Sequence, residues 1–304
     1  MKSYFIISFA VISLAFFLSS ERDASNLKDK GMSGQDTLSK TLLWKISGKN
    51  LMAPSYLFGT MHVLCAEDAR LSGGLLMAIG QADEIYFEIN LDDIMGMVQS
   101  LRYMRMTGSK KLSDLLDSAE YQKVKSYFDK QGSILPFSML ERFKPILISS
   151  LIEEDGMECK STNGMELVIQ KQAHLQSKKI FGLETAEFQA SLFDSIPYAQ
   201  QAKDLVNYID SIDFYKKTTN ELVEVYRAQD LDRIDFLTRT GDASMSNYID
   251  LLLYSRNRKW VDSLKVILPA KSLLIAVGAG HLPGDQGLIR LLRKAGYSVE
   301  PMKN

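Results

Sequence analysis

The chain has 304 residues, of which 46% are hydrophobic and 24% are charged, and its formal net charge is −1. This composition is typical of a globular protein with a large core, arranged as one sizeable domain or two small ones. The near-neutral charge gives no electrostatic basis for nucleic-acid binding, so no nucleic-acid partner is expected.

The N-terminal segment differs from the rest of the chain. Lys2 precedes an uncharged, mostly apolar run over residues 4–18, and a polar, charged stretch follows. The run is shorter than the ~20 apolar residues of a membrane-spanning helix. Residues 1–20 are therefore predicted to be a secretory signal peptide, and 21–40 a flexible leader. The protein is expected to be exported, to the periplasm or beyond the cell, with no membrane span after cleavage. The alternative is an uncleaved N-terminal membrane anchor.

Hydrophobic patterning predicts an α/β domain over residues 41–304. Short apolar runs separated by turn residues predict strands at 42–46 and 55–58 that form a hairpin, then a helix near 74–81 and a strand at 83–89. The succession of strand, helix and strand implies a parallel pair with a right-handed crossover.

The middle of the chain, about residues 92–262, is predicted to be a mostly helical insertion. The helices expected there cover 114–130, 137–152, 165–176, 186–195, 198–217, 220–227 and 245–265, with a short strand at 179–183. Ser113 and Asn163 are the predicted N-caps of the first and third of these helices. A strand at 272–277, a helix at 284–295 and a strand at 297–300 complete the domain. The predicted fold is a mixed central sheet with flanking helices and a large helical insertion.

The chain has two cysteines, Cys65 and Cys159. In an exported protein an even pair can form one disulfide, and two free thiols are the alternative. Neither cysteine lies in a C-x-x-C or zinc-finger spacing, so metal binding through thiolates is not expected.

Two segments near opposite ends of the domain share one pattern, an apolar run followed by Gly-x-x-His. The first ends at His62 and the second at His281, in a chain that has only three histidines. Glu88 and Glu184 also stand at the ends of predicted strands. Ligands of open α/β sheets bind at the carboxyl ends of the strands, so these four residues are the candidate metal ligands.

Two imidazoles with one or two carboxylates suit zinc, manganese, cobalt or iron, with an open position for water. A divalent ion lowers the pKa of bound water toward ~7, so hydrolysis of a peptide or another carbonyl compound is predicted, with Glu88 as ligand or general base. Arg142 has two interpretations, a charge at the rim of a buried helix or a clamp for the oxyanion.

Structural interpretations of the same residues stay open. A histidine after a strand can simply be hydrogen-bonded, and Glu88 can lie on the solvated face of an alternating strand. His174 stands among polar neighbours on a predicted helix and receives no function. The chain has no His-Glu-x-x-His helix, which leaves a second function open. This alternative is a non-catalytic envelope binding protein for haem, a peptide or a glycan in the same cleft.

Four short motifs occur in order along the chain. They are Tyr-Leu-Phe-Gly-Thr-Met-His at 56–62, Glu-Ile-Tyr-Phe-Glu at 84–88, Gly-Leu-Glu-Thr at 182–185 and Val-Gly-Ala-Gly-His-Leu at 277–282. Together they resemble the TraB/GumN family, and their order and spacing span almost the whole predicted domain.

The resemblance implies membership of a wider group that includes the Tiki proteins, which are metal-dependent proteases of the Wnt pathway. It also implies a more distant similarity to erythromycin esterase and the ChaN haem-binding proteins, and hence a fold of that kind. In the protease branch, two Gly-x-x-His motifs and a glutamate are associated with metal and activity. These roles carry over to His62, His281 and Glu88, and less directly to Glu184 and Arg142.

Overall fold

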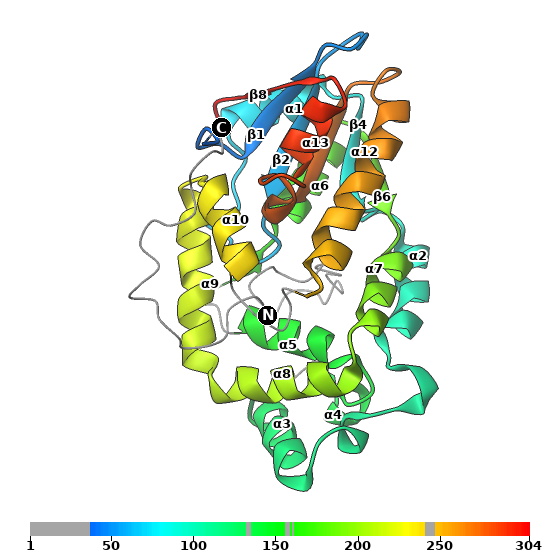
Figure 1. The fold of residues 1–304 in the computed structure, drawn as a ribbon, viewed down its shortest axis with the longest axis vertical. Helices are drawn as coiled ribbons and strands as arrows, with labels where there is room; N and C mark the ends of the chain where they lie inside the picture. Colours follow the sequence, from blue (N-terminus) through cyan, green and yellow to red (C-terminus); the bar gives the residue numbers. More distant parts are fainter. Residues whose placement is uncertain (1–36, 132–134, 156–158, 160, 241–246) are drawn as a thin grey trace.

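The computed structural model of the protein describes residues 37–131, 135–155, 159, 161–240 and 247–304 (Figure 1). The predicted signal peptide and most of the predicted leader lie outside these residues. Within the described ranges, no helix combines the length and the apolar character that crossing a bilayer requires.

A mixed six-stranded sheet organises the domain, with the strand order β6-β4-β7-β2-β1-β8. Its strands are β1 (Leu43–Ser47), β2 (Ser55–Thr60), β4 (Glu84–Ile89), β6 (Lys179–Glu184), β7 (Leu273–Gly278) and β8 (Ser298–Pro301). β1 pairs antiparallel with both β2 and β8, whereas β2, β7, β4 and β6 run parallel. The predicted α/β fold with a mixed central sheet is confirmed, as is the hairpin of the first two strands.

The strands β2 and β4 are parallel, as the sequence predicts, but they do not pair with each other. β7 lies between them and pairs with both. The physical reason is that β7 is apolar and buried on both faces, since Leu273 to Val277 are at most 1% exposed. A strand that is apolar on both faces is most stable at the centre of a covered sheet.

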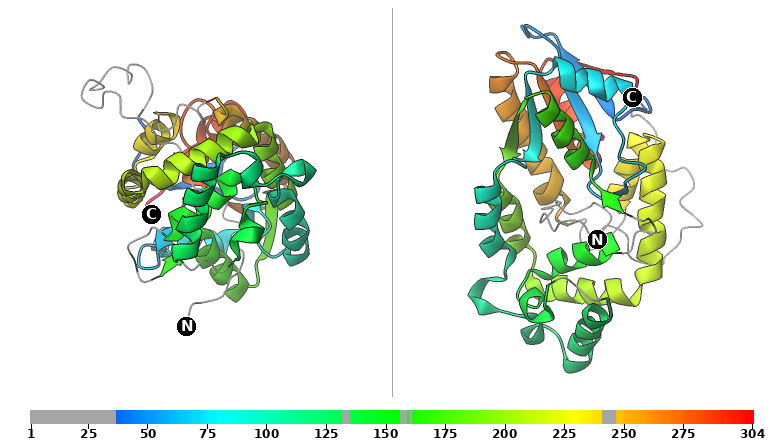
Figure 2. Two further views of the ribbon diagram at one scale, coloured as in Figure 1. Left: turned by 90° about the horizontal axis from the view of Figure 1, so that it is seen from below. Right: turned by 180° about the vertical axis from the view of Figure 1, so that it is seen from behind.

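Helices cover both faces of the sheet. α12 (Ser255–Ile267) and α13 (Leu288–Lys294) lie on one face, and α1 (Gly73–Gln81) and α6 (Met165–Leu175) lie on the other (Figures 1 and 2). Their apolar faces and the sheet form the main core of the protein.

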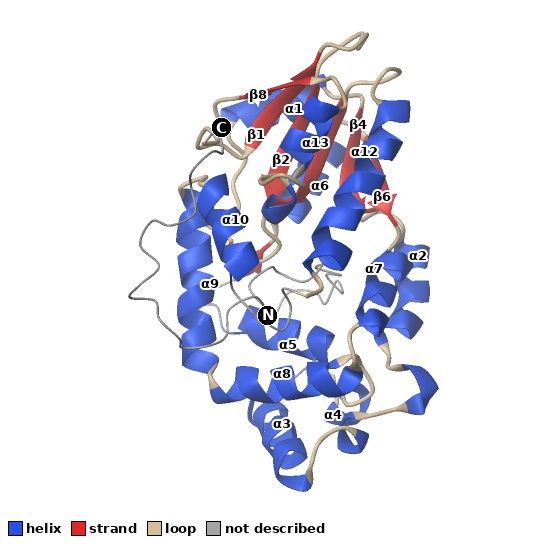
Figure 3. Cartoon of the chain, in the orientation of Figure 1, coloured by secondary structure: helices blue, strands red, loops and turns tan. Residues whose placement is uncertain are grey.

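The remaining helices extend beyond the carboxyl ends of the parallel strands (Figure 3). They are α2 (Ile94–Ser100), α3 (Ser118–Gln131), α4 (Phe137–Leu140), α5 (Pro145–Asp155), α7 (Ala186–Leu192), α8 (Tyr198–Asp210), α9 (Ile212–Arg227) and α10 (Leu231–Thr240). Some of them share a second apolar core, which includes Val124, Ile148 and Leu205. The predicted helical middle of the chain therefore has packing of its own below the sheet.

Several predicted helix boundaries in this part are wrong. α3 begins at Ser118 because Asp117 and Glu120 cap it reciprocally, each side chain accepting from the other's backbone N–H. The helix predicted over 137–152 is two helices, and the second begins at Pro145. Proline suits a first helical position, where its missing N–H has no partner to lose.

Two other boundaries also differ. Asn163 belongs to the short strand β5 (Thr162–Asn163), which pairs with β3 (Leu64–Cys65), so the N-cap of α6 is Gly164. The break predicted after residue 217 lies instead at Ser211, between α8 and α9. The helix predicted to begin at residue 245 starts outside the described residues, and its visible part is the π-helical turn η6 (Asp250–Tyr254) followed by α12.

Of the two alternatives for the cysteines, the structure contains the disulfide. Cys65 and Cys159 are bonded, with their Cα atoms 5.7 Å apart. The bond lies beside the β3–β5 pair, where the backbone N–H of Ala66 also donates to the carbonyl of Ser161. Together these links tie the segment that follows His62 to the segment that leads into α6.

Candidate functional site

Three of the predicted site residues converge at the carboxyl ends of β2, β4 and β7. His281 Nε2 lies 3.6 Å from Glu88 Oε1. A Cβ atom placed on Gly278 would lie 3.2 Å from Glu88 Oε1, 3.7 Å from His281 Cδ2 and 3.9 Å from His62 Nε2. Two imidazoles and one carboxylate thus surround a single glycine, where an added side chain would press on the carboxylate and contact both imidazoles.

The register of the sheet explains why the two Gly-x-x-His segments meet. β2 and β7 are parallel neighbours, and their last residues, Thr60 and Gly278, are paired. The two segments therefore leave the sheet at the same level. A Cβ on Gly59 would lie 3.1 Å from the Cα of Ala279, so glycine lets the second segment pack directly over the first.

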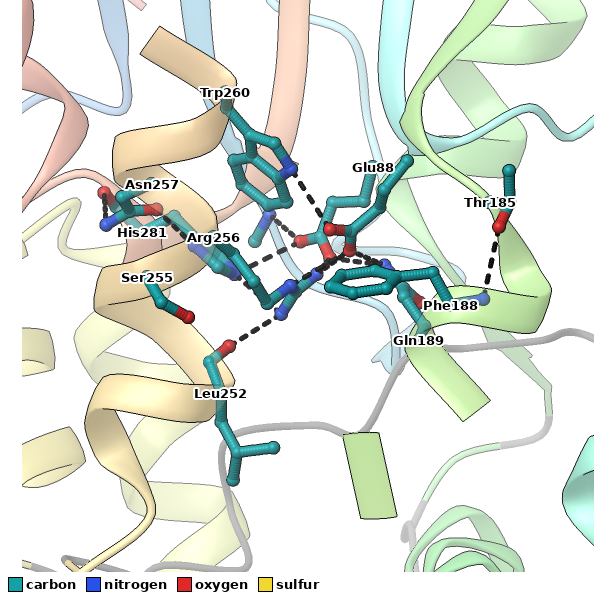
Figure 4. Close-up of polar contacts among 12 residues, drawn as sticks. Glu88, Thr185, Phe188, Gln189, Leu252, Ser255, Arg256, Asn257, Trp260 and His281 are labelled. Carbon is teal, nitrogen blue, oxygen red and sulfur yellow. Dashed lines mark hydrogen bonds and ion pairs between the residues drawn. The ribbon is translucent and has the colours of Figure 1, made fainter. Parts of the chain in front are cut away.

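A buried arginine that the sequence analysis did not single out joins these groups (Figure 4). Arg256, on α12, donates through Nη2 to Glu88 Oε2 and to Glu184 Oε1, and its Nε also donates to Glu184 Oε1, at 2.9 Å. Its Nη1 donates to the carbonyl of Leu252 and lies 3.3 Å from His281 Nε2. The guanidinium side chain is only 5% exposed, so the carboxylates around it provide the compensation that a buried charge needs.

Each histidine is fixed through its Nδ1 atom. His281 Nδ1 lies 2.6 Å from Asn257 Oδ1, and the Asn257 amide donates in turn to the carbonyl of Gln286. His62 Nδ1 lies 2.7 Å from Glu166 Oε1, on the first turn of α6. Both Nε2 atoms are thereby left for the site, and this kind of support orients histidine ligands in metal proteins.

The protonation states follow from burial and from these partners. Burial lowers the pKa of His281 to about 3, despite the opposing effect of Glu88, so its imidazole is neutral. Burial by itself would also lower the pKa of His62, but the Glu166 carboxylate outweighs it and raises the pKa to about 9. Burial opposes ionisation of Glu88, yet Arg256 and the two histidines lower its pKa to about 2. At neutral pH the site therefore holds a carboxylate, an imidazolium and a neutral imidazole.

Two of the predicted site residues, Glu184 and Arg142, do not line the cavity beside the histidines and Glu88. Glu184 is buried beside the site, but its Oε1 accepts from Arg256 and Gln189 and its Oε2 accepts from the Trp260 indole. It therefore holds the arginine in place. Arg142 is exposed, between α4 and α5, where its backbone carbonyl accepts from Met106. It is not among the residues that line the site cavity. The roles of Glu184 as ligand and of Arg142 as oxyanion clamp stay predictions.

A cavity opens beside these groups, with a volume of about 830 Å³ including its open mouth. His62, Glu88, Gln189, Arg256 and His281 line its polar end, and most of its other lining residues are apolar. Thr60 also lines it, and the buried Thr60 hydroxyl has no hydrogen-bond partner among the described residues.

The donor types suit a divalent metal ion, because two imidazoles and a carboxylate lie close together around Gly278, and the Thr60 hydroxyl without a partner lines the same cavity. Their spacing is wider than coordination requires. Among the described residues, no three His, Cys, Asp or Glu side chains lie close enough together to hold a metal ion. Arg256 Nη1 also lies 3.3 Å from His281 Nε2, where it donates to the lone pair that a metal ion would need. Metal binding therefore requires Arg256 to move away from this nitrogen.

The residues that sequence reasoning missed lie on helices. Arg256 and Asn257 belong to the buried face of α12, together with Trp260, Val261 and Leu264. A charged or amide side chain in an apolar stripe of helical period is the signal that would have found them, because arginine is rarely buried unless it is paired.

Comparison with known proteins identifies relatives of low sequence identity. The chain is 24% identical to metalloprotease TIKI2 of Danio rerio, over 90% of this chain and 62% of that protein. It is 21% identical to metalloprotease TIKI1 of Homo sapiens, over 92% of this chain and 66% of that protein. It therefore spans less than two thirds of the length of these relatives. It is also 23% identical to the uncharacterized protein YbaP of Shigella flexneri, over 79% of this chain and 88% of that protein.

No solved structure matches the chain. The sequence model of the TraB/PrgY/gumN family matches residues 42–301, from the start of the sheet to its last strand. The chain therefore belongs to the TraB/PrgY/gumN family.

Proposed function

We propose that the chain is a metal-dependent hydrolase that cleaves peptide bonds. The observation that carries the proposal is the convergence of His62, Glu88 and His281 around Gly278, with each histidine held through Nδ1 so that Nε2 faces the site. The distant relatives named metalloproteases give independent support.

In this proposal His62 and His281 hold the metal ion, and Glu88 serves either as a third ligand or as the general base. A bound divalent ion would polarise a carbonyl group and lower the pKa of water toward ~7. Glu166 and Asn257 orient the two imidazoles, as partners of the nitrogens that do not face the site.

The protein's own groups position the substrate and move the proton. Glu88 Oε1 accepts from the Gly278 N–H and is ionised, so this oxygen can take a proton from an attacking water. Arg256 places its guanidinium beside the same carboxylate, where it can stabilise the negative charge that develops on the carbonyl oxygen. Arg256, which lines the cavity, is thus a second candidate for the oxyanion role beside the one predicted for Arg142.

We also propose that the protein acts outside the cytoplasm, in the periplasm or the extracellular space. The Cys65–Cys159 disulfide supports this location, because such bonds persist in oxidising compartments.

Metal content and peptide hydrolysis test the proposal together. Wild-type protein and the variants His62→Ala, His281→Ala and His174→Ala are loaded with zinc, manganese, cobalt or iron, dialysed and subjected to elemental analysis. His174 is the matched control, because it lies on the surface against Asp92. About one metal ion per chain and cleavage of a peptide library are expected in the wild type and in His174→Ala, and neither in the other two variants. Equal metal content and activity in all four proteins would contradict the proposal.

A second candidate function is a binding protein without turnover, for haem, a peptide or a glycan. One observation favours it: Arg256 already pairs with Glu88 and Glu184 and contacts His281, which closes the polar end of the cavity. If the wild type takes up no metal and a ligand is bound stoichiometrically and recovered unchanged, this function replaces the first.

A further inference from the structure

We infer that the apolar part of the cavity is a specificity subsite, which binds an aliphatic or aromatic side chain of the substrate peptide beside the bond that is cleaved. The inference rests on the proposed hydrolase function and names its substrate class. The subsite residues come from the helical insertion and from the turn before α12, whereas three of the polar groups, His62, Glu88 and His281, lie on strands or in the segments that directly follow them.

The walls of this subsite are built by five separate elements. The end of α7 and the 3-10 turn η5 (Phe193–Ser195) contribute one apolar side chain each, as do α9 and α10, and η6 contributes two; these residues are Leu192, Phe193, Leu222, Ile234, Leu252 and Leu253. Because Leu252 lies one helical turn before Arg256 and its carbonyl accepts from the Arg256 guanidinium, an occupant of the subsite lies beside the candidate catalytic groups at the polar end of the cavity.

Among the described residues, the walls offer no partner to a charged substrate side chain. The ionic groups that this part of the chain contributes to the cavity lie at its polar end, where Arg256 is paired with Glu88 and His62 with Glu166. Burial of a charge against apolar walls without a partner is costly, whereas burial of an apolar side chain is favourable.

Tyr226 is the one tyrosine among the described residues that line the cavity, and its hydroxyl is already engaged. Tyr226 donates it to the backbone carbonyl of Gly59, at 2.9 Å, so this residue presents its ring to the cavity as apolar surface. The amide of Gln189 is likewise used by Glu88 and Glu184. The groups that can hydrogen-bond to a peptide backbone therefore lie at the polar end of the cavity. The walls present apolar surface, against which a substrate side chain can pack.

The test uses peptides of the form acetyl-Ala-Ala-X-Ala-Ala-amide, in which X is Leu, Phe, Gly, Asp or Lys. Cleavage rates are measured with metal-loaded wild type, and binding of the same peptides is measured calorimetrically with metal-stripped wild type. We expect the Leu and Phe peptides to exceed the Asp and Lys peptides by about 10- to 100-fold in kcat/KM, and to bind more tightly, since apolar pockets discriminate on this scale.

Two substitutions at one wall position then change the size of the subsite. Leu222→Trp fills it and is expected to lower kcat/KM and binding for the Phe peptide by about tenfold relative to the Gly peptide. Leu222→Ala enlarges it and is expected to move the preference from Leu toward Phe. Lys217→Trp is the matched control, because it adds the same side chain at an exposed position of α9, and it is expected to leave both preferences unchanged.

The cleavage and binding measurements distinguish a wrong subsite proposal from a wrong hydrolase proposal. Cleavage of all five peptides at similar rates would overturn the subsite and leave the hydrolase standing. Absence of cleavage, together with binding that prefers Leu and Phe and responds to both Leu222 variants, would support the subsite and reject the peptidase. Absence of any binding preference in the metal-stripped protein, or an equal response of Lys217→Trp, would overturn the subsite.

Discussion

The ion pair between His62 and Glu166 gives the metal-free protein a specific dependence of stability on pH. The Glu166 carboxylate raises the pKa of His62 to about 9, against the effect of burial, from an ordinary value of 6.5. A raised pKa means that the folded state holds a proton that the unfolded state has lost. The stabilisation is therefore complete below pH 6.5 and is lost as the pH rises through 9. At 1.36 kcal/mol for each pKa unit, this pair contributes about 3 kcal/mol.

The variant Glu166→Gln removes the carboxylate and nearly preserves the shape. Burial then acts on His62 without opposition, so its pKa is expected to fall below 6.5. The variant should be less stable than the wild type by about 3 kcal/mol at pH 6.5. Its free energy of unfolding should not show the wild-type decline between pH 6.5 and 9. Glu187→Gln is the matched control, because Glu187 occupies the same second position of α7 but is exposed.

Urea unfolding in EDTA at pH 6.5, 7.5 and 9 measures the free energy of unfolding of the three proteins. Because the chain has only three histidines, proton NMR of the imidazole rings follows the His62 titration directly once the His62→Ala spectrum has assigned it. A His62 resonance that titrates near pH 6.5 in the wild type, or an undiminished alkaline decline in Glu166→Gln, would refute the reasoning.

Three further outcomes are expected. Arg256→Met should lower the free energy of unfolding by about 3–5 kcal/mol, because it leaves two buried carboxylates without their partner; Arg256→Lys should lower it less, and an equal loss in both would count against charge pairing. Serine at both Cys65 and Cys159 should destabilise the protein by about 3–5 kcal/mol in urea, since the bond closes a separation of 94 residues; a thermal midpoint unchanged by reductant in the wild type would contradict this. Gly278→Ala should weaken metal uptake, because its Cβ would stand 3.2 Å from a site carboxylate oxygen, whereas Gly73→Ala, which meets nothing within 4 Å, should leave uptake unchanged.

The strands were predictable because each is a short apolar run between turn residues, and the two Gly-x-x-His segments were predictable because they follow such runs. The position of β7 between β2 and β4 was not predictable, since several strands are apolar on both faces and the order in which they pair depends on tertiary packing. Helix breaks at Ser211 and before Pro145 depend on packing within the insertion, which local pattern does not determine.

The supporting residues of the site were missed for a different reason. Glu166 shares the buried face of α6 with Met165, Ile169 and Ala173, just as Arg256 lies on the buried face of α12. In the sequence such a residue is one polar position in an apolar stripe, and its partner lies far away, 168 positions in the case of Arg256 and Glu88. Only the tertiary fold shows which opposite charge it meets.

The charges of the site link metal uptake to the protonation of His62. Glu88, Glu166 and Glu184 stand against Arg256 and the His62 imidazolium, so three formal negative charges meet two positive ones and leave −1. A divalent ion needs the neutral imidazole and expels the His62 proton, which changes the formal charge of the site from −1 to zero. Metal binding should therefore release about one proton per chain below pH 9 and tighten as the pH rises toward that value. In Glu166→Gln, whose His62 is already neutral, binding should release no proton and should depend little on pH.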